Sequence, residues 1–395
     1  LDLGRRFGDD NQFGARVNLV HREGETAVED DKRRTTLASV GLDYRGDRFR
    51  SSLDFGYQKK TFHGGTMGVN ISGIDVIPAV PDTRKNYSQQ WGYSDIENEF
   101  GMAKAEYDLT RDWKAYAGLG AQHGHETGVY SAPKLINANG DATVGRLDTN
   151  RIIDAFSGMA GLEGKFTTWA VSHRVNVGYS AQIKRDKTAW RMSANNPTTN
   201  IYDNHDVAIP DNAYFGGNYS DPLTTARNRT QGWLFSDTLG FFGDRVLLTA
   251  AARHQKVVVR NYSNATGLED TASRYTQSRW MPTFGLVYKP WETVSLYANH
   301  TEALQPGGIA PKEAANFGQS TGIARSKQNE VGVKVDFERV GGSLALFEIK
   351  KPATMIDSNN YYTLNGEQRN RGVELNVFGE PAFGLRLNGS ATWLS

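Results

Sequence analysis

Residues 171–184 read VSHRVNVGYSAQIK, and their side chains alternate in character at every second position. One phase is apolar except for His173, whereas the other phase, which begins with Ser172 and Arg174, is polar or small. A period of two places successive side chains on opposite faces of a β-strand, while a helix would show a period near 3.6. The same alternation recurs in residues 49–58 and 385–393. The pattern predicts strands with one apolar and one polar face.

Sixteen segments of this kind follow one another, and the lengths of their connections alternate. The segments start near residues 1, 13, 35, 48, 97, 113, 150, 171, 229, 245, 277, 293, 324, 342, 366 and 384. Short turns are expected at 9–12, 46–47, 110–112, 165–170, 243–244, 290–292, 339–341 and 379–383, and long loops at 25–34, 61–96, 126–149, 187–228, 261–276, 304–323 and 353–365. If the strands run up and down, all short turns share one end, which is the asymmetry of outer-membrane barrels. We therefore predict an all-β fold, a transmembrane antiparallel up-and-down β-barrel.

The composition excludes several other classes of protein. The chain has 395 residues, 45 Lys and Arg against 44 Asp and Glu, a net charge of +1 and no Cys. The mean hydropathy is −0.56, and no run approaches the roughly 18 apolar residues of a membrane-spanning helix. A near-neutral charge without a basic stripe argues against nucleic-acid binding. Without Cys there is no disulfide scaffold, no Cys-ligated zinc and no Cys nucleophile. No catalytic constellation is evident, so we do not expect an enzyme.

Aromatic residues flank the predicted short turns. A membrane interface favours a ring of such side chains at one rim, because one part of each side chain can contact lipid while another part contacts water. Ordinary hairpin packing is the alternative for any single residue. The set comprises Phe49, Trp113, Phe166, Trp169, Phe241, Phe242, Trp291, Phe378 and Phe383.

The strand count alone favours a sixteen-strand porin with an open lumen, but two long loops favour a receptor. Residues 61–96 and 187–228 are rich in aromatics within a Gly, Asn and Asp background. Aromatic side chains on exposed loops indicate a binding surface more often than a sieve, although some of them pack the loop itself. These residues are Tyr87, Trp91, Tyr93, Trp190, Tyr202, Tyr214, Phe215 and Tyr219.

Five stretches resemble a known family of transporters. Residues 294–307 (VSLYANHTEALQPG) and 326–334 (SKQNEVGVK) resemble consecutive strands of TonB-dependent ferric-siderophore receptors. Residues 366–375 (GEQRNRGVEL) resemble a third stretch of that family, and residues 3–8 and 13–18 resemble its early barrel. The stretches occur in the family's order along the whole chain.

The resemblance implies a barrel of 22 strands closed around an N-terminal plug domain. Matching the early hairpin to the second and third strands places one strand before Leu1 and five after Ser395. Both ends of the sequence stop in patterned segments. We therefore expect residues 1–395 to be a partial barrel domain, without the plug, the energy-coupling segment or the C-terminal strands.

The function implied by the resemblance is that of an outer-membrane receptor that binds a ferric siderophore, more specifically a hydroxamate of ferrichrome type, and imports it with TonB-coupled energy. The implied partners are the siderophore, the TonB complex (through an N-terminal region absent from this sequence), and outer-membrane lipid and lipopolysaccharide. We expect a monomer in the bacterial outer membrane, no nucleic acid and no resident cofactor, since the ferric siderophore is cargo. A passive porin, a receptor for haem, cobalamin or sugar, and a surface adhesin remain as alternatives.

Candidate ligand-binding residues follow from the same resemblance, since hydroxamate receptors place aromatics just beyond certain strands. The candidates are Phe62 and His63 after the fourth strand, Trp91 and Tyr93 in the loop that follows, Tyr130 after the sixth strand, and Trp190, Tyr214 and Phe215 after the eighth. Aromatic walls suit a compact chelate because they bind its organic arms without displacing iron.

Two polar clusters have competing interpretations. His123 and His125 could clamp a metal at two-residue spacing, but solvated residues at a strand end are favoured. The charged loop 25–34 could bind a divalent cation or phosphates of lipopolysaccharide, but a solvated loop tip is favoured. No metal site is therefore predicted.

Overall fold

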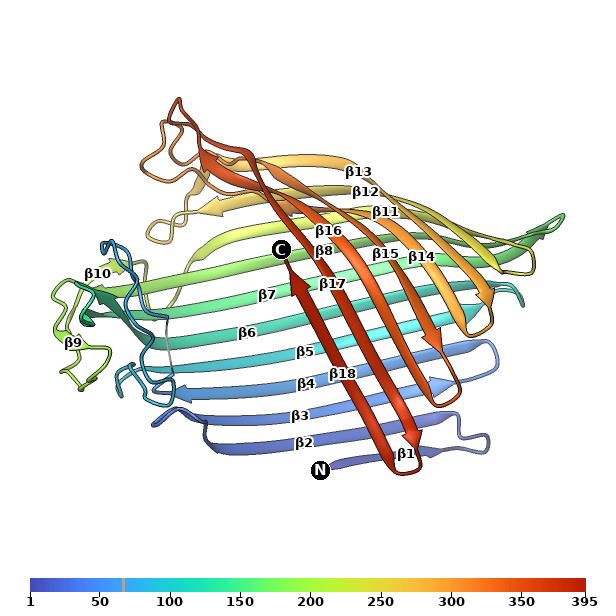
Figure 1. The fold of residues 1–395 in the computed structure, drawn as a ribbon, viewed down its shortest axis with the longest axis horizontal. Helices are drawn as coiled ribbons and strands as arrows, with labels where there is room; N and C mark the ends of the chain where they lie inside the picture. Colours follow the sequence, from blue (N-terminus) through green and yellow to red (C-terminus); the bar gives the residue numbers. More distant parts are fainter. Residues whose placement is uncertain (66–67) are drawn as a thin grey trace.

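The computed structural model describes residues 1–65 and 68–395, and these residues form eighteen strands in one sheet (Figure 1). None of them forms a helix long and apolar enough to cross a membrane. The strands are β1 (Asp2–Phe7), β2 (Phe13–Glu25), β3 (Lys32–Arg45), β4 (Phe49–His63), β5 (Tyr93–Asp108), β6 (Trp113–Leu135), β7 (Asp141–Thr168), β8 (Val171–Ser193), β9 (Thr198–Asn200), β10 (Asn212–Gly216), β11 (Thr224–Phe241), β12 (Val246–Tyr262), β13 (Glu269–Trp291), β14 (Val294–Pro306), β15 (Ile323–Asp336), β16 (Val340–Ile356), β17 (Tyr362–Ala382) and β18 (Leu385–Leu394).

Sixteen of these strands are the predicted ones, and each pairs antiparallel with the next along the chain. The exception is β8, which pairs with β11, because the short strands β9 and β10 lie within their connection and pair with β7 and β8. Figure 1 shows β14–β18 crossing in front of β2–β7, so the sheet rolls round on itself. The up-and-down antiparallel β fold is confirmed.

Four predicted long loops are wrong in their bounds, because the strands run into them: 25–34, 126–149, 261–276 and 353–365 shrink to residues 26–31, 136–140, 263–268 and 357–361. The largest change is between β6 and β7. The hairpin of β6 and β7 stays in unbroken register from Trp113 opposite Gly164 to Leu135 opposite Ala142, so the predicted loop 126–149 shrinks to five residues. The turn depends on Asn137, whose side-chain oxygen accepts the backbone N–H of Asn139 at 3.0 Å. Gly140 then adopts a φ of 90°, which favours glycine. As a result, Tyr130 lies on a strand, and Trp190 does too because β8 runs to Ser193.

The two faces of the sheet differ as predicted. On β4, Leu53 and Phe55 belong to the apolar face and are 43% and 55% exposed, as side chains that contact lipid would be. On the same strand, Arg50 belongs to the polar face and pairs with Asp108 of β5 at 2.6 Å. An outer-membrane barrel turns its polar face to the lumen. At the end with short turns, Trp169 and Phe383 are almost fully exposed, in keeping with an interfacial girdle.

Aromatic side chains on one strand repeatedly cover glycines on the next. Phe100 lies over Gly56, and Tyr116 lies over both Gly161 and Gly178. Each glycine leaves room for a ring to lie flat against the backbone, where a β-carbon would collide with it. These pairs explain why a chain rich in aromatics also contains 42 glycines.

Candidate functional site

The loops that follow β4 and β8 are joined by hydrogen bonds around Gln89, whose side chain is fully buried. Its Oε1 accepts the backbone N–H of Val207 at 2.8 Å, and the backbone N–H of Gln89 donates to Ser131 Oγ at 3.1 Å. The indole N–H of Trp91 donates to the carbonyl of Val207 at 3.1 Å. Because the contacts link two loops and β6, these segments form one body above the strands.

A small hydrophobic core supports this body. Leu135, Ala142 and Ile201 are buried together, and Val69 and Ile74 of the first loop pack against them. Removing such side chains from water stabilises by about 25 cal/mol per Å². The tip of the β6–β7 hairpin therefore serves as the foundation for both loops.

The second loop is anchored at Asp148 of β7, a fully buried carboxylate. Arg146 Nε donates to it at 2.7 Å, Arg191 Nη2 lies at 2.9 Å, and Asn212 Nδ2 donates at 2.9 Å. A buried charge is tolerated only when it is paired and hydrogen-bonded, and two guanidiniums meet that need here. Since Asn212 begins β10, the carboxylate fixes β10 to β7 and β8.

Tyr219, in the loop after β10, packs against one of the arginines that bind Asp148. The Arg191 guanidinium stacks 4.0 Å from the Tyr219 ring centre, and the phenol donates to the carbonyl of Thr149 at 3.1 Å. Burial raises the pKa of the Tyr219 phenol above its usual value. The phenol is therefore a stable donor at neutral pH.

Four of the predicted ligand residues belong to the polar face, near the ends of β4, β6, β8 and β10: Phe62, Tyr130, Trp190 and Tyr214. Phe62 and Trp190 belong to one lateral row of register partners, which runs through Ser94 of β5. The Tyr130 phenol lies 3.1 Å from the Ser94 hydroxyl, and its ring covers a glycine of the same row. The arrangement is an aromatic shelf at the top of the polar wall, which we call the shelf.

The other four predicted residues lie apart from the shelf. His63, Tyr93 and Phe215 belong to the opposite face, where the rings of His63 and Tyr93 are 6.1 Å apart. Phe215 is 64% exposed. Trp91 is held within the loop body by its bond to Val207. A common position near a strand end does not place side chains on a common face, because the face depends on parity.

Residues that organise the loops were not predicted. Gln89, Asp148 and Arg191 are ordinary polar residues in polar segments, and nothing in their local sequence marks them as buried. The turn sequence 137–140 (NANG), read together with the alternation on either side, could have revealed the long hairpin that buries Asp148.

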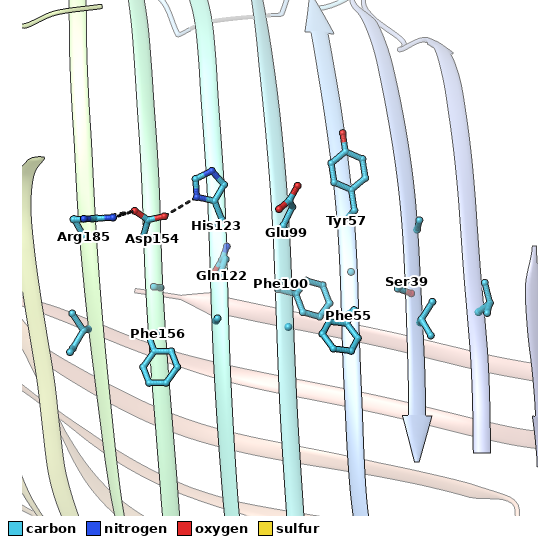
Figure 2. Close-up of a pocket in the computed structure, with 18 of the residues that line it drawn as sticks. Ser39, Phe55, Tyr57, Glu99, Phe100, Gln122, His123, Asp154, Phe156 and Arg185 are labelled. Carbon is cyan, nitrogen blue, oxygen red and sulfur yellow. Dashed lines mark hydrogen bonds and ion pairs between the residues drawn. The ribbon is translucent and has the colours of Figure 1, made fainter. Parts of the chain in front are cut away.

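A groove of about 1090 Å³ lies on the opposite, apolar face, and Phe55 and Phe156 are among the residues that line it. Figure 2 shows His123, Asp154 and Arg185 side by side at its upper edge, on β6, β7 and β8. His123 Nδ1 lies 2.7 Å from one Asp154 oxygen, and Arg185 Nη2 donates to the other at 2.6 Å. The groove is thus apolar below and charged above.

The structure gives different outcomes for the two polar clusters, which are the His123–His125 pair and the charged loop 25–34. His123 and His125 share a face, but their rings bond to Asp154 and Asn150 respectively. Within residues 1–65 and 68–395, no group of three or more His, Cys, Asp or Glu side chains could hold a metal ion. In the charged loop, the interpretation as a solvated tip is wrong for Asp31, which is buried and accepts bonds from Thr26 and Arg33.

The family follows from a comparison with known proteins. The family model described as "TonB dependent receptor-like, beta-barrel" matches residues 10–395. The chain belongs to this family. The predicted resemblance is therefore confirmed, and the chain is an outer-membrane β-barrel rather than an enzyme.

Several named receptors are similar to the chain. The ferrichrome receptor FcuA of Yersinia enterocolitica is 50% identical over 400 residues, a match that covers the whole chain and 52% of that protein. The metal-pseudopaline receptor CntO of Pseudomonas aeruginosa is 25% identical, with 56% of it covered. The crystal structure of BauA, the ferric preacinetobactin receptor of Acinetobacter baumannii, superposes with a TM-score of 0.88 at 30% identity and covers the whole chain and 59% of that protein. The chain spans about half the length of the curated relatives it matches.

Proposed function

We propose that the intact protein is a receptor and active transporter for a ferric siderophore of hydroxamate type. The shelf carries this proposal, because Phe62, Tyr130 and Trp190 present aromatic surface at the top of a polar wall. The name of the 50% identical relative, a ferrichrome receptor, favours a hydroxamate over a catecholate.

The shelf suits a chelate whose iron is already fully coordinated. Ring faces of Phe62 and Trp190 pack against organic arms, while the Tyr130 phenol, which donates to Glu126 at 2.7 Å, offers a polar edge. The iron stays in the chelate, and no covalent bond forms on the protein. Below the shelf, polar side chains such as Asn176 and Ser180 line the path inward.

The complete receptor requires parts beyond residues 1–395. Each of β1 and β18 has one neighbouring strand within the described chain. An exposed strand edge in a bilayer leaves backbone groups unsatisfied at several kcal/mol each, so further strands must close the barrel. We place the rest of the ligand pocket on a plug domain, which the TonB complex pulls to open the lumen.

Outer-membrane lipid is the second partner that we propose, for a monomeric receptor. Arg185, Arg227 and Arg260 are successive register partners on the apolar face, next to the groove of Figure 2. Asp154 pairs with Arg185 at 2.6 Å and Glu269 lies 4.0 Å from Arg260, whereas the ion pairs of the described residues do not include Arg227. Like charges opposite one another repel, so a further anion at Arg227 is favourable. The phosphates of lipopolysaccharide supply that charge, and its acyl chains fit the apolar groove beneath.

Tryptophan fluorescence of the full-length protein in detergent tests the receptor. We expect saturable quenching by ferrichrome at sub-micromolar concentrations, no saturable quenching by a ferric catecholate, and loss of most of the signal in Trp190→Phe. Trp169→Phe is the control, because Trp169 lies at the opposite end of the strands and is 96% exposed. Absence of quenching by both chelates, together with a conductive pore in bilayers, would favour a porin instead.

A further inference from the structure

A recess on the polar face lies between two cations that the shelf does not use. Its volume is about 250 Å³, and its lining includes Lys104 on β5 and Arg253 on β12. Between them lie Gly118 of β6, Ser157 of β7 and Ser180 of β8. The lining therefore includes small residues on three successive strands, beside the longer side chain of Met159.

The strand register explains why the recess stays open. Lys104 pairs with Gly118, and the same lateral row continues through Met159 to Ser180. Neighbouring strands are about 4.8 Å apart, so Lys104 and Ser180 are separated by roughly 14 Å along the row. Met159 leans over Gly118, which has no side chain to oppose it. A small group can thus enter from the lumen between the two ends of the row.

At the far end of the row, Ser180 contacts the guanidinium of Arg253, which has further N–H donors. Arg253 Nη2 donates to Ser180 Oγ at 2.8 Å, a neutral acceptor. Arg253 Nε is buried and has no hydrogen-bond partner within the described chain. A buried donor without an acceptor costs about 1–3 kcal/mol, so the site is incomplete without another group.

Neighbouring cations on the same face behave differently. Lys114 lies 3.0 Å from Glu163, and Arg151 lies 2.9 Å from Asp186. In the part of the chain that the structure describes, the ion pairs include neither Lys104 nor Arg253. Lys114 and Arg151 thus have carboxylate partners on the wall, whereas Lys104 and Arg253 line the recess.

We propose that the recess is a carboxylate-binding site. A carboxylate has two oxygens, so it can accept from the Lys104 ammonium on one side and from Arg253 on the other, with the Ser157 hydroxyl as a further donor. The carboxylate comes either from an acidic side chain outside residues 1–395 or from a visiting ligand. The second source rests on the proposed transport function, and the first does not.

Zero-length coupling with a carbodiimide tests the site in the full-length protein, in outer-membrane preparations. The reagent activates a carboxylate, which then forms an amide with a lysine in contact with it, and peptide mass mapping identifies the product. Coupling of Lys104 to an Asp or Glu of the protein without any addition indicates a resident carboxylate. Coupling only after addition of citrate, the probe, indicates a visiting one. The Lys114–Glu163 pair is the internal positive control.

Variants keep the test decisive. Arg253→Gln is expected to reduce the Lys104 product roughly tenfold or more, because the second charge-assisted contact is lost, whereas Arg253→Lys retains most of it. Lys104→Arg abolishes the product but preserves folding, which the Lys114 product reports. No Lys104 product under either condition, or equal yield in Arg253→Gln, overturns the proposal. Ferrichrome quenching in the same preparation reports the transport function separately.

Discussion

Gln89 Oε1 accepts the backbone N–H of Val207 at 2.8 Å, a contact that joins two loops more than a hundred residues apart in the chain. Gln89 also donates from Nε2 to the carbonyl of His205 at 3.3 Å. A single side chain thus satisfies backbone groups of the second loop from within the first. Because the loops share these bonds, we infer that they move together.

Replacing Gln89 should separate the loops without unfolding the sheet. Gln89→Ala leaves the Val207 N–H without the acceptor it has in the structure, at about 1–3 kcal/mol. The His205 carbonyl keeps the Thr199 hydroxyl at 3.3 Å. We expect hydrogen exchange to accelerate roughly 5- to 100-fold in residues 68–92 and 198–212, but not in β14–β17. Gln90→Ala is the control, since Gln90 is exposed. Unchanged exchange in Gln89→Ala would mean that the loops are held elsewhere.

Two glycines beneath Tyr116 should respond differently to alanine. A Cβ at Gly161 would lie 2.5 Å from Tyr116 Oη and 2.6 Å from the carbonyl oxygen of Val177, which is backbone and cannot move away. A Cβ at Gly178 would meet Tyr116 Oη at 2.5 Å, but its next neighbour is at 3.5 Å, so the phenol can swing aside.

We therefore expect Gly161→Ala to destabilise the full-length barrel by about 1–3 kcal/mol and Gly178→Ala by clearly less. Urea unfolding followed by heat-modifiable mobility on gels measures the difference. Equal losses in the two variants would show that the backbone contact at Val177 is unimportant.

The Tyr219 anchor predicts a loss of stability in alkali. Since burial raises the pKa of its phenol above the unfolded value of 10.0, its contribution is fully present below pH 10 and declines as the pH rises through the higher folded pKa. Tyr219→Phe keeps the ring beneath Arg191 but removes the ionisable group. Tyrosinate absorbance during a pH titration should lose one component that titrates above pH 10 in that variant, and a titration near pH 10 for Tyr219 would contradict burial.

The arginine row should bind lipid phosphates. Arg227 pairs in register with Arg185 and with Arg260, and Arg227→Gln removes the middle charge. We expect copurifying lipopolysaccharide, measured by native mass spectrometry, to fall roughly fivefold. Arg339→Gln is the control, because Arg339 lies in the turn before β16, at the opposite end. An equal fall in both variants would indicate a general charge effect.

Alternation was enough to predict the sixteen long strands. When one face of a strand is apolar, apolar residues recur at every second position of the sequence. It could not predict β9 and β10, which have three and five residues and pair on other strands' free edges. The same parity rule, applied to the candidate site, separates Phe62 from His63 although they are adjacent. Sequence position near a strand end identified both, but only the strand register decides which one faces the lumen.

The buried polar residues lay beyond sequence reasoning for a different reason. Asp148 is buried because Arg146, Arg191 and Asn212 converge on it from three strands. That convergence depends on register and on the course of a long loop, neither of which alternation encodes. The family resemblance supplied the architecture but no loop contacts.

The length of β7 has a consequence at the cell surface. The strand has 28 residues, whereas a tilted membrane crossing uses about 9–11. At about 3.3 Å per residue, roughly 60 Å of ribbon therefore projects past the bilayer. A ribbon of that length reaches through the inner sugars of the outer leaflet, so antibodies and other large particles that are kept away from the lipid can still touch its tip.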